Sequence, residues 1–348
     1  MMVDFDKLSQ DEQLIRVEAA LVAGLDRFGL ESDCQIQMIN HSENTTYRIE
    51  SPGRIENSGR TENPGAEPCV IRVHREDYHS RRGIECELAW MQALNDQAGV
   101  PTPRPIPGLD GEVIQTVAGH GLPRERYAVR FAWIDGEAPD ENKDLIAPFI
   151  QLGEVTARTH VHSKSWLLPA DFERLRWDFE ATLGGNPNWG RWEAAPGLDG
   201  GDHALLERCA QLIGARLTAF GQAPARFGLI HADFRLANLL VHNGETRVID
   251  FDDCGIGWYL YDLASALSFM EERTDLPELI AAWCEGYRRI QPIDADEEAE
   301  IRTFLMLRRM LILAWMGSHA ETDLAKELGG PYIVDTMPLA EAYLSSHG

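Results

Sequence analysis

The 348-residue sequence lacks several features that would define its class at once. Its six cysteines are scattered and form no C-x-x-C pair, which argues against a zinc site or a disulfide framework. The N-terminal segment has neither a basic region nor an apolar core, so we expect no signal peptide. The apolar stretch from Phe304 to Gly317 is interrupted by Arg308 and Arg309, so no membrane span is indicated. We therefore expect a cytoplasmic protein without a membrane partner.

Positive charge is also scarce. The chain has 32 Lys and Arg against 56 Asp and Glu, a formal net charge of -24. This balance disfavours nucleic acid as a partner, because phosphate backbones require basic patches. It suits a cationic substrate such as an amine, although solubility alone would also explain it. The sequence leaves the oligomeric state open.

What is present indicates a globular protein of two lobes. Hydrophobic residues make up 44% and charged residues 25% of the chain, which is typical of folded domains. A length of 348 residues exceeds one ordinary domain.

The most informative stretch runs from Gly228 to Ala264 and reads GLIHADFRLANLLVHNGETRVIDFDDCGIGWYLYDLA. Short apolar runs alternate in it with acidic and amide residues. Asn243-Gly244 lies between two of these runs, and both residues tolerate positive φ, so the sequence predicts a hairpin turn there. The predicted loop and hairpin bring Asp233, Asn238 and Asp250 around one small volume.

These residue types match the needs of phosphoryl transfer, which asks a protein mostly for positioning and charge neutralisation. Asp233 is suited to accept the proton of an attacking hydroxyl. Asn238 and Asp250 offer the oxygen ligands that Mg²⁺ prefers. Protein kinases use H-R-D-x-x-x-x-N and then D-F-G for these tasks, and the Asp-to-Asn spacing is the same here. Arg235 lies where many kinases carry a lysine that contacts phosphate.

The motif H-A-D-x-x-x-x-N, followed by I-D-F-D-D and Y-D-L-A, resembles the aminoglycoside phosphotransferase family. That family also includes choline, homoserine and methylthioribose kinases and a bacterial stress-response protein kinase. The resemblance implies an α+β, bilobal, protein-kinase-like fold. Residues 1–132 would form an N-lobe with an antiparallel sheet and helices, and residues 133–348 a mostly helical C-lobe. It also implies ATP and Mg²⁺ as cofactors.

In kinases of this fold, a strand lysine contacts the nucleotide phosphates and pairs with a helix glutamate. The predicted strand Cys69–His74 has no lysine, and Arg72 occupies the matching position. The amphipathic segment Gly83–Leu94 offers Glu85 and Glu87 as its partners, and we favour Glu87. The alternative is a surface arginine on an edge strand.

Four more residues are assigned to the nucleotide by position and resemblance. Ser42 and Asn44 belong to a loop between two predicted strands that resembles the phosphate-covering loop of the family. A plain polar hairpin without a role in binding would have the same residue pattern. Ala132 and Ile134 lie in a segment that resembles the hinge between lobes, where backbone groups would pair with an adenine edge.

Three further features have competing interpretations. His160 and His162 could ligate a metal, but on a helix their rings point apart, so packing is favoured. The tryptophans between Trp166 and Trp192 could line an acceptor pocket, since indole faces attract ammonium groups, but core packing is favoured here too. In related kinase-like folds an aspartate at the position of Asp262 braces the loop around the base, so the resemblance implies support of Asp233, which we favour over a substrate contact.

The sequence therefore predicts an enzyme that transfers the γ-phosphoryl group of ATP to a hydroxyl of a small molecule. Amino alcohols or homoserine-like metabolites are the first expectation and aminoglycosides the second. A protein serine/threonine kinase is an alternative. A nucleotide-binding module with little catalysis is another, because Arg72 replaces the usual lysine.

Overall fold

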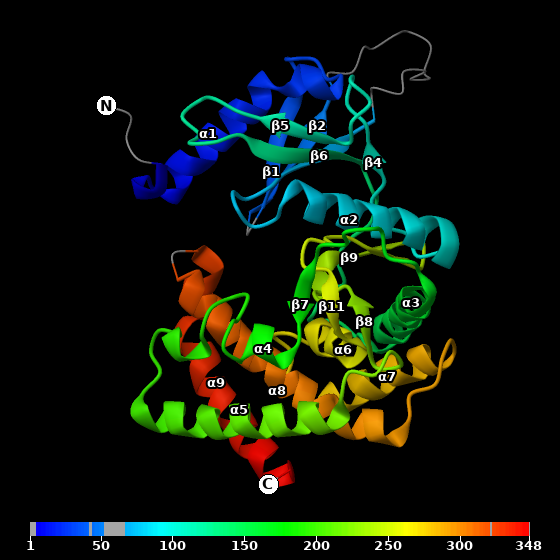
Figure 1. The fold of residues 1–348 in the computed structure, drawn as a ribbon, viewed down its shortest axis with the longest axis vertical. Coiled ribbons are helices and arrows are strands. Elements are labelled where there is room, and N and C mark those ends of the chain that lie inside the picture. Colours follow the sequence, from blue (N-terminus) through cyan, green and yellow to red (C-terminus); the bar gives the residue numbers. More distant parts are fainter. Residues whose placement is uncertain (1–4, 42–43, 52–66, 321, 348) are drawn as a thin grey trace. The chain divides into compact units, whose positions relative to one another are not determined.

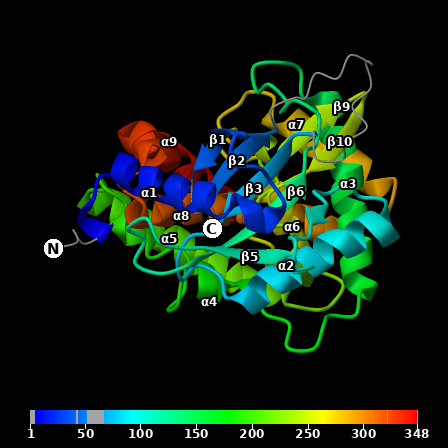
Figure 2. The same ribbon diagram turned by 90° about the horizontal axis from the view of Figure 1, so that it is seen from above.

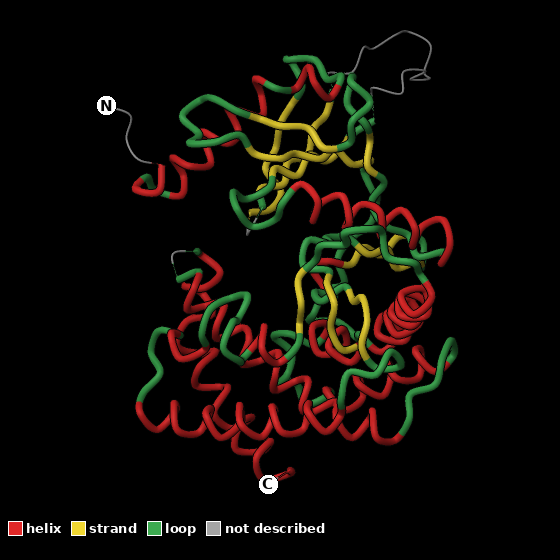
Figure 3. The backbone as a smooth tube through the Cα atoms, viewed as in Figure 1, coloured by secondary structure: helices red, strands yellow, loops and turns green. Residues whose placement is uncertain are grey.

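The computed structural model describes residues 5–41, 44–51, 67–320 and 322–347. The chain divides into two compact units (Figures 1 and 3). Unit 1 comprises Met1–Gln92 and Pro103–Asp135, and unit 2 comprises Ala93–Thr102 and Gly136–Gly348. Strands form the centre of unit 1, whereas helices dominate unit 2 (Figure 3).

Unit 1 is built on an antiparallel sheet in the order β1-β2-β3-β6-β4, with β5 also pairing with β6. The strands are β1 (Gln35–His41), β2 (Thr45–Glu50), β3 (Cys69–Val73), β4 (Pro105–Ile106), β5 (Ile114–Val117) and β6 (Arg126–Ala132). β3 is a central strand, so the edge-strand interpretation of Arg72 is wrong.

Two helices accompany this sheet, α1 (Gln10–Ala23) and α2 (Arg81–Ala93) (Figures 1 and 2). A capping box between Ser9 and Glu12 begins α1, and one turn of 3₁₀-helix at Leu25–Phe28 follows it. The apolar face of α1 is buried with the inner residues of β2 and β3 in one core. The regular helix ends at Ala23, and the 3₁₀ turn continues the apolar face as far as Phe28.

Unit 2 is mostly helical. Its helices are α3 (Ile146–Ser165), α4 (Phe179–Thr182), α5 (Gly200–Phe220), α6 (Tyr259–Ala266), α7 (Leu276–Arg288), α8 (Ala295–Ser318) and α9 (Asp323–His347), with a kink at Gly329 in the last. Its strands are β7 (Leu175–Trp177), β8 (Phe227–Ile230), β9 (Leu239–His242), β10 (Glu245–Val248) and β11 (Gly255–Trp258). β9 and β10 form the predicted hairpin around Asn243, which has a φ of 51°.

Two glycines allow α3 and α7 to pack closely. A Cβ atom at Gly153 would lie 2.1 Å from the carbonyl oxygen of Trp283, and one at Gly286 would lie 1.9 Å from that of Ile150. Any larger residue would force the helices apart. The close approach brings His160 of α3 within 2.9 Å of the Tyr287 hydroxyl of α7.

No helix in the described ranges is both long enough and apolar enough to cross a membrane.

Candidate active site

The loop that follows β8 carries Asp233 and is held by α6. Asp262 accepts hydrogen bonds from the backbone N–H groups of His231, at 3.1 Å, and Ala232, at 2.7 Å. The hydroxyl of Ser265 accepts the N–H of Phe234 at 3.0 Å. These bonds satisfy buried donors that the turn would otherwise leave unpaired. They confirm the prediction that Asp262 supports this loop.

The positive φ of Ala232 shows how sharply the chain turns before Asp233. Its φ of 70° is unfavourable for a residue with a side chain. Asp262 accepts the N–H of this same residue, and Asp262 is in turn bonded to His160 Nε2 at 2.9 Å. The turn that presents Asp233 therefore depends on a buried carboxylate and on α3.

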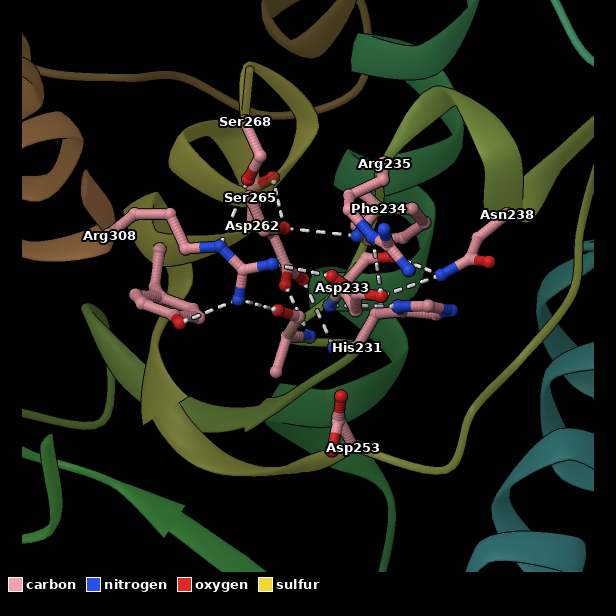
Figure 4. Close-up of polar contacts among 12 residues, drawn as sticks. His231, Asp233, Phe234, Arg235, Asn238, Asp253, Asp262, Ser265, Ser268 and Arg308 are labelled. Carbon is pink, nitrogen blue, oxygen red and sulfur yellow. Dashed lines mark hydrogen bonds and ion pairs between the residues drawn. The ribbon is translucent and has the colours of Figure 1, made fainter. Parts of the chain in front are cut away.

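Asp233 is 6% exposed, and both of its carboxylate oxygens are paired (Figure 4). Oδ1 accepts from Nη2 of Arg308 at 2.6 Å. Oδ2 accepts from Nε of Arg235 at 3.0 Å and from Nδ2 of Asn238 at 2.7 Å. Burial alone would raise the pKa of this carboxyl group, but the charges of Arg235 and Arg308 outweigh burial and hold the pKa below its usual value.

Asn238 connects the loop to the segment that carries Asp250. Its Nδ2 donates to both the backbone oxygen and Oδ2 of Asp233, and its backbone oxygen accepts the N–H of Ile249 at 2.9 Å. The ring of His231 also reaches the Ile249 carbonyl, at 3.1 Å. The structure thus joins Asp233 and Asn238 directly and places Asp250 next to a residue bonded to both His231 and Asn238.

The donor set of Asn238 and Asp250 fits a hard divalent cation. Because the amide nitrogen of Asn238 faces Asp233, its Oδ1 is left without a hydrogen bond to any described residue. Asp250 adds a carboxylate from a backbone with a φ of 61°. Magnesium commonly takes one or two protein oxygens and completes its shell with phosphates and water. The described residues contain no group of three His, Cys, Asp or Glu that could hold a metal without such help.

The residues assigned to the nucleotide from sequence lie in unit 1. Arg72 is 6% exposed, and its Nη2 lies 2.8 Å from Oε2 of Glu87, the predicted partner. Glu85 instead pairs with Arg81 and Arg82 on the surface of α2. The chain therefore keeps a buried cation–carboxylate pair between a central strand and a helix.

The other three described residues of this set lie at or beside the ends of strands in unit 1. The side-chain oxygen of Asn44 accepts the N–H of Arg75 at 3.1 Å, so part of this buried side chain holds the fold. Ala132 donates its N–H to the backbone oxygen of Arg104, at 2.9 Å. An adenine contact at Ala132 would therefore have to use the carbonyl oxygen of Ala132. Ile134 lies just beyond the end of β6. Ser42 lies outside the described residues.

Two interpretations favoured from sequence agree with the contacts. His160 bonds to Asp262 and Tyr287, whereas His162 contacts Gln97 at 3.1 Å, so the two histidines share no metal. Of the four tryptophans between Trp166 and Trp192, the last three are buried in packing. Trp177 also donates to the backbone oxygen of Asp253 at 2.8 Å and so supports the loop after Asp250.

Sequence reasoning missed Arg308, which it treated only as an interruption of an apolar stretch. Arg308 lies in α8, is 2% exposed and donates to Asp233 across 75 residues of chain. A signal was present, because a charged residue within an apolar helix must find a buried partner. The sequence could not name that partner.

Comparisons with known proteins show the family of the chain. A model of the phosphotransferase enzyme family matches residues 37–293, so the chain belongs to this family. It is a phosphotransferase of the kinase class with the predicted α+β, bilobal, protein-kinase-like fold.

Among the proteins it resembles, one solved structure is a microcompartment-associated aminopropanol kinase. That chain is 39% identical, with a TM-score of 0.85, and the match covers 95% of this chain and 98% of the other. Amicoumacin kinase of Bacillus subtilis (strain 168) is 24% identical over 322 residues, which is 89% of this chain and 85% of that protein. The structure of amicoumacin kinase hAmiN in complex with AMP-PNP, Ca²⁺ and Ami is similar in fold, with 19% identity, a TM-score of 0.70, and coverage of 97% and 94%.

Proposed function

We propose that this protein transfers the γ-phosphoryl group of Mg²⁺-ATP to the hydroxyl of a small amino alcohol. The observation that carries the proposal is the hydrogen-bonded unit of Asp233 and Asn238, continued through Ile249 to Asp250. This unit supports the proposal because it joins the carboxylate of Asp233 to the amide of Asn238 and to the segment that carries Asp250, the two proposed magnesium ligands. The 39% identity to an aminopropanol kinase supports the acceptor class.

Each residue then has a defined task. The acceptor hydroxyl oxygen attacks the γ-phosphorus, the bond from that phosphorus to the β-phosphate oxygen breaks, and the hydroxyl proton passes to Oδ2 of Asp233. Asn238 Oδ1 and the Asp250 carboxylate would hold Mg²⁺, which when bound neutralises charge on the phosphates. The reaction's loose transition state requires an oriented carboxylate more than a strong base.

Arg235 is the proposed phosphate contact of the loop. Its Nε is bonded to Asp233, but its terminal nitrogens contact no acceptor among the residues that the structure describes. The side chain is 28% exposed, so these nitrogens can bind phosphate. Binding there would draw Arg235 away from Oδ2 and free that oxygen for the acceptor.

Arg72 would neutralise nucleotide phosphate, with Glu87 fixing its orientation. The alternative of a nucleotide-binding module with little catalysis rests on the missing lysine. A buried arginine–glutamate pair supplies the same charge arrangement that kinases obtain from lysine and glutamate, so that alternative loses its main support. Ser42, Asn44, Ala132 and Ile134 remain proposed contacts of the nucleotide.

Asp233→Asn tests the proposal. We expect turnover with 1-aminopropan-2-ol, followed by ADP release, to fall by about 10²–10⁴-fold, since that is the usual contribution of a general base. The melting temperature of the variant shows whether it is folded. A folded variant that keeps turnover within about tenfold of wild type would refute the assignment of Asp233 as the base.

A further inference from the structure

Arg308 is buried at the centre of a polar cluster that includes the proposed base (Figure 4). Its three nitrogens donate to different elements. Nη2 donates to Asp233 Oδ1 at 2.6 Å, Nη1 to the Tyr261 hydroxyl at 3.0 Å, and Nε to the Ser268 hydroxyl at 2.9 Å. The guanidinium therefore joins α8 to the loop that carries Asp233, to Tyr261 in the first turn of α6, and to Ser268, which follows that helix.

Aromatic rings limit the movement of this guanidinium. Its central carbon lies 5.3 Å from the ring centre of Trp189 and 5.7 Å from that of Tyr261. Cation–π contacts of this kind are strongest where water is excluded, and Arg308 is 2% exposed. The side chain is thus fixed by packing as well as by hydrogen bonds.

The next residue, Arg309, provides a comparison within the same helix. It is 1% exposed and bonded to Glu271 at 3.0 Å, to the Thr336 hydroxyl at 2.8 Å and to the Tyr332 carbonyl at 3.0 Å. None of these partners belongs to the loop that carries Asp233. Two equally buried arginines of α8 therefore have separate surroundings, and one of them contacts the site.

The two oxygens of Asp233 are held differently. Oδ1 is bonded to a fully buried arginine, whereas Oδ2 is bonded to Asn238 and to Arg235, whose side chain is 28% exposed. We propose that Arg308 is a positioning residue that keeps Oδ1 and so presents Oδ2 of Asp233 to the acceptor hydroxyl. This inference rests on the proposed function, in which Asp233 receives the hydroxyl proton.

Four variants test it: Arg308→Met, Arg308→Lys, Arg309→Met and Arg309→Lys. ADP release is measured with varied Mg²⁺-ATP and varied 1-aminopropan-2-ol, below the melting temperature of each variant. We expect Arg308→Met to lower kcat about 100-fold, because an ill-oriented group can cost that much, with KM for Mg²⁺-ATP changed less than about threefold. Arg308→Lys keeps the charge but not all three bonds, so its kcat should exceed that of Arg308→Met by about tenfold.

Both Arg309 variants should melt at lower temperature while keeping kcat within about threefold of wild type, because their lost contacts lie away from Asp233. This separates positioning from support of the fold. If Arg308→Met does not fold, the kcat of Arg308→Lys still tests the positioning role. A folded Arg308→Lys with wild-type kcat, or an equal fall of kcat in the Arg309 variants, overturns the inference.

Failure of the proposed function gives a different result. In that case the wild-type protein releases no ADP in response to 1-aminopropan-2-ol. If the wild type is active and the Arg308 variants match it, the positioning role alone is wrong.

Discussion

At the scale of single residues, Asn238 makes contacts with both its side chain and its backbone. The nitrogen of its amide donates to Asp233, at 2.9 Å to the backbone oxygen and 2.7 Å to Oδ2, and the oxygen of the amide is a proposed metal ligand. Its backbone oxygen also fixes Ile249, the residue before Asp250. A single amide therefore connects the proposed base and the proposed metal ligands.

Asn238→Ala should weaken Mg²⁺-ATP binding by about tenfold or more, a usual cost of disturbing a metal site. The rise in melting temperature on adding Mg²⁺-ATP should become smaller, because ligand stabilisation depends on the ratio of concentration to Kd. Asp250→Ala should behave in the same way. Asn243→Gly is the control, since Asn243 lies in the hairpin turn with a φ of 51°, which glycine tolerates. An undiminished thermal shift in both Asn238→Ala and Asp250→Ala would refute the metal assignment.

The limits of the sequence prediction are also clearest for single residues. The helix after the strand offered Glu85 and Glu87 as partners of Arg72, and Glu87 was favoured from its distance to the prolines that follow at Pro101 and Pro103; the pair with Glu87 is present at 2.8 Å. Arg308 could not be assigned to Asp233, because their contact depends on how α8 packs against α6. Local pattern indicates which residues carry chemistry, whereas partners distant in sequence depend on tertiary packing.

At the scale of elements, the loop of Asp233 depends on α6 and α3. Asp262 of α6 accepts two loop N–H groups, and Nε2 of His160 in α3 donates to the same carboxylate at 2.9 Å. Asp262 was indicated by the resemblance to kinase-like folds, in which an aspartate at the start of this helix braces the loop. His160 was interpreted only as a packing residue, since nothing in α3 itself points to the loop.

His160 makes the stability of this arrangement depend on pH. Burial lowers the pKa of its ring below the usual histidine value, although Asp262 opposes the shift. In the unfolded chain the ring takes up a proton near pH ~6.5. The unfolded state then binds more protons than the folded state, so the free energy of unfolding falls as pH drops through that value.

We therefore expect the slope of unfolding free energy against pH, between about pH 7 and pH 5, to become smaller in His160→Gln, because this variant cannot take up that proton when it unfolds. Urea unfolding at several pH values measures the slope. His120→Asn is the control, since His120 is exposed on a loop. A His160→Gln slope equal to that of the wild type would show that this ring does not contribute.

At the scale of the whole molecule, the chain is organised as two units, and their boundary does not follow the order of the sequence. The sequence predicted one division at residue 132, whereas the contacts group Ala93–Thr102 with unit 2. The backbone oxygen of Pro101 accepts the N–H of Val248 at 3.1 Å, and Asn95 bonds to Thr102. The segment 93–102 therefore packs with unit 2, although it lies between two stretches of unit 1 in the sequence.

The net charge of -24 also acts at this scale, and it bears on the acceptor. An acidic protein attracts a cationic substrate over a distance that salt shortens to about 8 Å at physiological ionic strength. For the proposed acceptor, kcat/KM should therefore fall as salt is raised, with ATP kept saturating. The neutral propane-1,2-diol has a similar size and a hydroxyl in the same position, but carries no charge to be attracted.

We expect 1-aminopropan-2-ol to be preferred over propane-1,2-diol by about tenfold or more in kcat/KM at about 0.02 M KCl, and the preference to shrink by about 0.3 M KCl as charges are screened. The diol should show no comparable salt dependence, so it controls for effects of salt on the enzyme itself. Equal kcat/KM for the two acceptors, or equal salt dependence, would show that positive charge is not recognised. The acidic composition would then reflect solubility, and the acceptor would be selected by shape and hydroxyl position.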